Sequence, residues 1–142
     1  MENGLRIVIP EGGAASLPRG RLPSPPMSSS PAAPKPVRYG CVIRVRPERF
    51  EEYKREHAAV WPGVLATITK CHIRNYSIYH KDGFLFGYYE YYGSDHAADM
   101  KVMAADPTTQ RWWALMEPMQ DPLETRAPGE WWARMEEVFH LD

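Results

Sequence analysis

The chain has 142 residues, of which 44% are hydrophobic and 25% charged, and its formal net charge is −1. A chain of this length forms one domain, and a near-neutral charge without a Lys/Arg block excludes charge-driven binding to nucleic acid or to an anionic membrane. No apolar run approaches the roughly 18 residues that cross a membrane. We therefore expect a globular cytoplasmic protein.

The first 36 residues differ in composition from the rest. They hold 8 of the 14 prolines and 4 of the 10 glycines, and they contain no aromatic residue or histidine. Such a segment has too little apolar surface to offset the entropy lost on ordering. We predict a disordered leader over residues 1–36 and a single folded domain over residues 37–142.

A strand followed by two short helices is predicted at the start of the folded domain. Alternating apolar residues indicate a strand over residues 39–46. Pro47 suits the first position of a helix that runs to about Val60. Pro62 disfavours helical backbone at Trp61 and suits the start of a second helix.

A β-hairpin is predicted next. Residues 72–80 alternate, so that Tyr76 and Ile78 share one face while Ile73 points to the other. The Asp82-Gly83 pair favours a type I′ turn because both residues tolerate positive φ. The returning strand, residues 84–92, is aromatic on both faces.

Two more helices and a last strand complete the predicted elements. Ser94 is the predicted N-cap of a helix that ends near Ala105, and Asp106-Pro107 begins the next one. The C-terminal residues 131–141 alternate in hydrophobicity, which favours a strand.

This element order is the β-α-β-β-α-β pattern of a ferredoxin-like α+β fold, with helices on one face of the sheet. The other face is lined with aromatic side chains and has no helix to cover it. We expect it to pack against a second copy, which gives a homodimer with a dimeric α+β barrel.

The best candidate for a functional cluster lies on the first helix. Tyr53 and His57 are four residues apart and share a helix face, and Trp61 follows them. An imidazole and a phenol can transfer protons, and an indole offers a flat apolar surface, which together suit a sugar ligand. A lone helical histidine is more often a packed or solvated residue, so the spacing alone does not assign it.

The chain resembles the L-rhamnose mutarotase family from about Arg38 to Asp142. The resemblance rests on four motifs in the family's order, namely YKREH at 53–57 with WP at 61–62, NYSIY at 75–79, QRWW at 110–113 and EVFHL at 137–141. Two features depart from the short bacterial members, namely the leader and the Trp131-Trp132 pair. That pair could shape a pocket rim or a dimer contact.

The resemblance implies a catalytic histidine at His57 and a sugar site at Tyr53, Tyr76, Trp112 and Trp113, without a metal or cofactor. The implied partner is a small-molecule monosaccharide. The implied reaction interconverts the α and β anomers of L-rhamnose or a related 6-deoxy aldose by ring opening, with acid/base transfer by His57. A tyrosine or an ordered water is the second proton-transfer group in this interpretation.

Two alternatives remain open at the level of the sequence. Ferredoxin-like dimers also include small monooxygenases and haem-degrading enzymes, because a fold does not fix the chemistry. The aromatic residues could also form a non-catalytic sugar-binding module.

Overall fold

The computed structural model describes residues 34–142, so nearly all of the predicted leader lies outside the described residues. The elements, in chain order, are β1 (Val37–Val45), the 3-10 helix η1 (Pro47–Arg49), α1 (Phe50–His57), α2 (Pro62–Lys70), β2 (Ile73–Lys81), β3 (Phe84–Tyr91), α3 (His96–Ala105), α4 (Pro107–Met116), the 3-10 helix η2 (Glu117–Met119), β4 (Gln120–Asp121) and β5 (Ala133–Met135).

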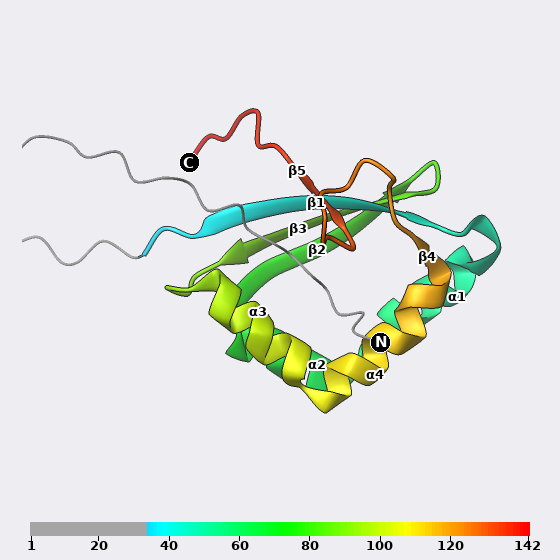
Figure 1. Cartoon of the computed structure of the whole chain (residues 1–142), viewed down its shortest axis with the longest axis horizontal. Coiled ribbons are helices and arrows are strands. Elements are labelled where there is room, and N and C mark those ends of the chain that lie inside the picture. The colour runs from blue at the N-terminus through cyan, green and yellow to red at the C-terminus, as the bar shows by residue number, and fades with distance from the viewer. Residues whose placement is uncertain (1–33) are drawn as a thin grey trace, which may run out of the picture.

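The strands form one antiparallel sheet in the order β2-β3-β1-β4, and β5 pairs with β1 as well. All four α-helices lie on the same side of this curved sheet (Figure 1). The predicted α+β ferredoxin-like arrangement of helices on one face is therefore confirmed for the single chain.

The hairpin turn forms as the sequence predicts. Asp82 and Gly83 have φ values of 51° and 82°, which are the positive angles of a type I′ turn. This turn fixes the register of β2 against β3 at Lys81 and Phe84.

The helix boundaries agree in part with the predictions. The Asp106 carboxylate accepts a hydrogen bond of 2.8 Å from the Thr109 amide, as predicted for the N-cap of α4. The N-cap of α3 is Asp95, whose carboxylate accepts from the Ala98 amide at 3.0 Å, so the prediction of Ser94 is wrong. A charged carboxylate is a stronger acceptor than a hydroxyl, which explains the choice.

The first helix is shorter than predicted, because α1 ends at His57 instead of Val60. Trp61 has a ψ of 134°, which is the extended conformation that a following proline favours. The chain leaves the helix early enough to reach that conformation.

The predicted C-terminal strand is mostly absent. Only Ala133–Met135 pair with β1, and residues 136–142 form no regular structure. Beyond Met135 the tail is held by a side-chain ion pair, in which Arg38 donates to both oxygens of Glu137 at 2.8 and 2.9 Å. The side-chain pair takes the place of a backbone ladder.

The core has two clusters on the helix side of the sheet. One surrounds Ile43, Leu85 and Trp112, and the other surrounds Tyr39 and Tyr89. Residues of both clusters border a cavity between the sheet and the helices.

Candidate functional site

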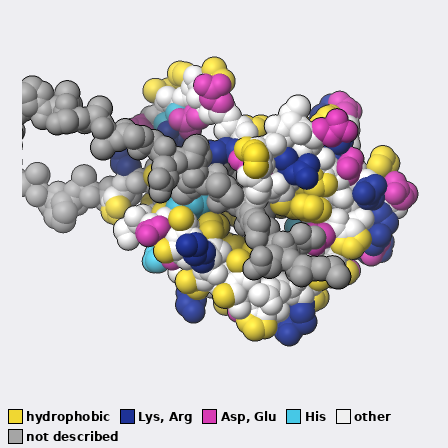
Figure 2. Space-filling view, viewed as in Figure 1, with side chains coloured by type: hydrophobic (Ala, Val, Ile, Leu, Met, Phe, Trp, Pro, Cys, Tyr) yellow, Lys and Arg dark blue, Asp and Glu magenta, His cyan; other side chains and the backbone are white. Residues whose placement is uncertain are grey.

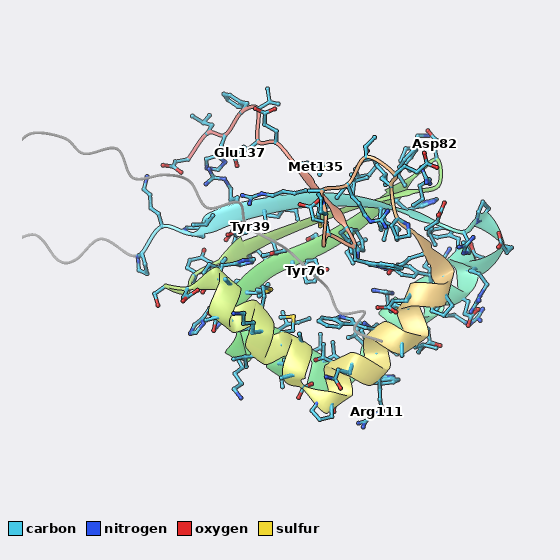
Figure 3. All side chains as sticks on the ribbon, viewed as in Figure 1. Tyr39, Tyr76, Asp82, Arg111, Met135 and Glu137 are labelled. Atoms are coloured by element: carbon cyan, nitrogen blue, oxygen red, sulfur yellow. The ribbon has the colours of Figure 1, made fainter. Side chains whose placement is uncertain are left out.

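The cavity has a volume of about 400 Å³, which is within the range of small-molecule pockets. Its lining is mainly aromatic and aliphatic, and it includes all five residues predicted for the site, namely Tyr53, His57, Tyr76, Trp112 and Trp113. These residues come from α1, β2 and α4, which the fold brings together around one space. Figure 3 shows Tyr76 between the sheet and the helices.

His57 lies at the end of α1 with its ring fixed by the backbone. Its Nδ1 is 2.9 Å from the carbonyl oxygen of Tyr53. Because a carbonyl can only accept, Nδ1 carries the hydrogen of the neutral ring and Nε2 keeps its lone pair. Burial lowers the pKa of His57, so the ring is a neutral base at pH 7.

Tyr53 supports this histidine from within the core. Its ring stacks on His57 at a centroid distance of 4.1 Å. Its hydroxyl accepts a long hydrogen bond of 3.5 Å from the Gln120 amide, and the Gln120 carbonyl accepts from the Trp131 indole at 2.8 Å. Burial raises the pKa of Tyr53, so its phenol keeps its proton at neutral pH.

Tyr76 enters the cavity because of a β-bulge. The register of β2 against β3 shifts between Arg74 and Ser77, and Asn75 has a φ of 49°. Asparagine tolerates this left-handed conformation better than most residues, and its amide donates to Glu90 at 2.7 Å. The bulge places Tyr76 edge-on to Tyr89 with ring centroids 5.6 Å apart.

The bulge also corrects one prediction about β2. Strict alternation placed Ile73 on the face opposite Tyr76, whereas Ile73 is buried and also lines the cavity. An extra residue in a strand reverses the alternation beyond it.

The phenol of Tyr76 is exposed in part and keeps its proton. Tyr76 is 41% exposed and lines the cavity. Burial raises the pKa of Tyr76 well above its ordinary value. Tyr76 can therefore donate a hydrogen bond but keeps its proton at neutral pH.

The two adjacent tryptophans serve different purposes. Trp112 is buried in the core, where its ring lies edge-on to His57 at 5.4 Å and to Trp61 at 5.3 Å. Trp113 is only half-buried. Both indoles line the cavity, and Trp113 also packs against both core clusters. That one indole serves the core while its neighbour meets a ligand therefore stays a prediction.

The cavity also includes residues that the sequence did not assign to a site, namely Tyr89, Glu117, Gln120, Trp131 and Trp132. Trp131 and Trp132 are the pair that departs from the short bacterial members of the family, and both indoles are part of the cavity wall. Glu117 follows Trp113 by four residues, so helical spacing could have placed it on the same face.

The surface of the described residues gives few signs of a charged ligand. On the face shown in Figure 2, Lys and Arg side chains are spread among acidic and uncharged ones. Within residues 34–142, no helix is long and apolar enough to cross a membrane. Both cysteines, Cys41 and Cys71, are free thiols.

Comparison with known proteins then decides the family, because the family profile described as L-rhamnose mutarotase matches residues 38–141. The chain belongs to the L-rhamnose mutarotase family. A relative from Lactiplantibacillus plantarum with this name is 34% identical over 108 residues, covering 75% of this chain and 99% of the relative. An L-rhamnose mutarotase from Sinorhizobium fredii is 35% identical over 107 residues, covering 73% and 97% of the two chains.

A solved structure supports the fold. The crystal structure of an L-rhamnose mutarotase from Formosa agariphila superposes with a TM-score of 0.58 at 19% identity, covering 75% of this chain and 99% of that one. At this identity the likeness concerns the fold alone.

Proposed function

We propose that the protein is a mutarotase that interconverts the α and β anomers of L-rhamnose or a related 6-deoxy aldose. The observation that carries this proposal is the neutral imidazole of His57, whose Nδ1 is held by a backbone carbonyl in a cavity that Trp112 and Trp113 also line. A group that accepts and returns a proton thus stands beside aromatic surface suited to a sugar.

Interconversion of anomers proceeds through the open-chain aldehyde. A base removes the proton of the anomeric hydroxyl while an acid protonates the ring oxygen, and the ring opens. After rotation about the C1–C2 bond, the ring closes on the other face of the carbonyl and both protons return. His57 Nε2 is suited to the proton at the anomeric oxygen, because an imidazole exchanges protons readily near neutral pH.

The aromatic wall suits a 6-deoxy sugar. The C–H faces of a pyranose pack on indole and phenol rings, and the methyl group at C6 prefers an apolar surface. Tyr76 can donate its hydroxyl to an oxygen of the sugar. Apolar surface alone rejects an added hydroxyl by only ~10²-fold, so the preference over ordinary hexoses should be moderate.

The test is anomeric exchange of L-rhamnose, measured by saturation-difference NMR on the wild type and on His57→Ala. Loss of one proton-transfer group should reduce the enzymatic exchange rate by ~10²–10⁴-fold. His140→Ala, in the exposed C-terminal tail, is the matched control and should exchange like the wild type. Binding of rhamnose by the wild type without faster exchange would instead identify a sugar-binding module.

We also infer a homodimer that covers the outer face of the sheet. Val42, Phe86 and Tyr79 are register partners across β1, β3 and β2, and Phe86 and Tyr79 are 36% and 69% exposed. An exposed, largely aromatic row on a sheet face that no helix covers is typical of an interface. A second copy with the same row would bury it around a two-fold axis.

We place this enzyme in the cytoplasm. The two cysteines are free thiols, and a reducing compartment keeps thiols in that state.

A further inference from the structure

Glu117 lies on the wall of the same cavity as His57. It is the first residue of η2 and follows Trp113 by one helical turn, so the two side chains share a face. In the chain, Glu117 stands between Trp112 and Gln120. Trp112 contacts the ring of His57, and the side-chain amide of Gln120 donates a hydrogen bond to the hydroxyl of Tyr53.

Among the residues that line the cavity in the described part of the chain, Glu117 is the one carboxylate. No hydrogen bond or ion pair within residues 34–142 engages its side chain. Glu130, by contrast, accepts hydrogen bonds from the amides of Ala127 and Arg134 at 3.1 and 3.2 Å. Glu117 is half-buried and lines the cavity.

The other titratable groups of the cavity are poor partners for proton exchange. Three phenols line it, and burial raises the pKa of each, namely Tyr53, Tyr76 and Tyr89. Burial also raises the pKa of Glu117 and lowers that of His57. The carboxyl and the imidazole thus approach each other in proton affinity, whereas the phenols move away from neutrality.

We propose that Glu117 is the second proton-transfer group of the anomer interconversion and acts on the ring oxygen while His57 acts on the anomeric oxygen. This inference rests on the mutarotase function proposed above. It replaces the tyrosine or ordered water of the sequence-based interpretation with a carboxyl group.

The proton transfers balance without any co-reactant. His57 Nε2 takes the proton of the anomeric hydroxyl as the protonated Glu117 gives its proton to the ring oxygen. The C1–O5 bond breaks and the C1=O1 bond forms. After rotation about C1–C2, the Glu117 carboxylate takes the proton of the C5 hydroxyl as that oxygen attacks C1. The imidazolium returns its proton to O1, and both groups regain their starting states.

This scheme requires His57 and Glu117 together to hold one transferable proton. Below both apparent pKa values the pair holds two protons and His57 cannot accept one. Above both it holds none, and no group can protonate the ring oxygen. The rate of exchange should therefore follow a bell-shaped pH profile whose two pKa values belong to the pair.

The experiment measures the pH profile of anomeric exchange of L-rhamnose by NMR, with the uncatalysed rate subtracted at each pH. Glu117→Gln should lower the rate by ~10²-fold or more and convert the bell into a single step, because an amide cannot exchange the proton. Glu117→Asp should keep the bell shape at a reduced rate. Glu124→Gln, an exposed glutamate in the following loop, should match the wild type in rate and profile.

The outcomes separate this inference from the proposed function. A Glu117→Gln enzyme that keeps the bell-shaped profile and its kcat would overturn the inference and leave the mutarotase intact, even if its KM rises. A wild type without enzymatic exchange on any 6-deoxy aldose would overturn both. If a thermal unfolding curve shows that Glu117→Gln is not folded, Glu117→Asp provides the test. A Glu117→Asp enzyme without a bell-shaped pH profile would contradict the scheme.

Discussion

The chemistry of the site depends on one backbone hydrogen bond. The carbonyl of Tyr53 accepts from His57 Nδ1 within the last turn of α1. This hydrogen bond selects the tautomer of His57, because a carbonyl can only accept.

The hydroxyl of Tyr76 should contribute to binding more than to turnover. Tyr76→Phe keeps the ring and removes one hydrogen bond of about 1 kcal/mol, so KM for rhamnose should rise by roughly fivefold to tenfold with kcat nearly unchanged. Steady-state kinetics of anomeric exchange measures both constants. Tyr79→Phe, on the opposite face of the same strand, is the control, and equal effects of the two changes would refute a role for the Tyr76 hydroxyl.

Two histidines should make stability depend on pH. Burial lowers the pKa of both His57 and His96 in the folded state, so the unfolded chain binds protons more readily. Above the unfolded pKa of ~6.5 both rings are neutral in the folded and in the unfolded chain, so they do not reduce stability. As the pH falls from there through the folded pKa values, the unfolded chain takes up protons first and stability is lost. Urea unfolding at pH 7.5 and at pH 5.5 should give a lower free energy of unfolding at pH 5.5. His57→Ala should weaken this dependence, and an unchanged slope would argue against burial of the ring.

At the scale of elements, the bulge in β2 directs the side chain of Tyr76 into the cavity. Its unusual angle lies at Asn75, where φ is 49°. Asn75→Val places a β-branched residue in the left-handed region and removes the bond to Glu90, which should cost about 2–3 kcal/mol of stability. Relief of that strain by a shift of register would move Tyr76 out of the cavity and raise KM for rhamnose.

Asn75→Gly is the matched control for this element, because glycine adopts the left-handed conformation without strain. It should keep the bulge and near-normal KM while losing the bond to Glu90. Unfolding curves and exchange kinetics of both variants give the comparison. A valine variant as active as the glycine variant would show that the bulge does not position Tyr76.

Local signals predicted the elements that depend on local chemistry. The Asp82-Gly83 turn and the starts of α2 and α4 follow from positive φ, from proline at the first helical position and from the Asp106 cap. The bulge at Asn75 was missed because the alternation of β2 continues through it in the sequence. The C-terminal strand was overextended because its alternation cannot show where the pairing with β1 stops, which is at Gly40.

The same division applies to the site. Spacing on one helix brought Tyr53 and His57 together, and family motifs supplied Tyr76, Trp112 and Trp113. Glu117 lies four residues after Trp113, a local signal that was not used, whereas the place of Gln120 on the cavity wall depends on how β4 packs against α1. That packing connects residues 67 positions apart, such as Tyr53 and Gln120, and no local pattern encodes it.

At the scale of the whole molecule, the uncovered face of the sheet governs assembly. Phe86→Arg places a charge in the centre of the aromatic row and should convert a dimer into a monomer of 16.3 kDa. Sedimentation velocity at micromolar concentration measures the change. Val102→Arg, exposed on α3 on the helix side of the molecule, should leave the dimer intact. A wild type that sediments as a monomer would contradict the proposed interface.

The concentration of indoles around one space has a practical consequence. Four of the five tryptophans of the chain, Trp112, Trp113, Trp131 and Trp132, line the cavity. Indole emission depends on the polarity around the ring, so a sugar that displaces water from this space should change the intrinsic fluorescence of the protein. The affinity of the enzyme for each of a panel of aldoses can therefore be measured by fluorescence titration without a label.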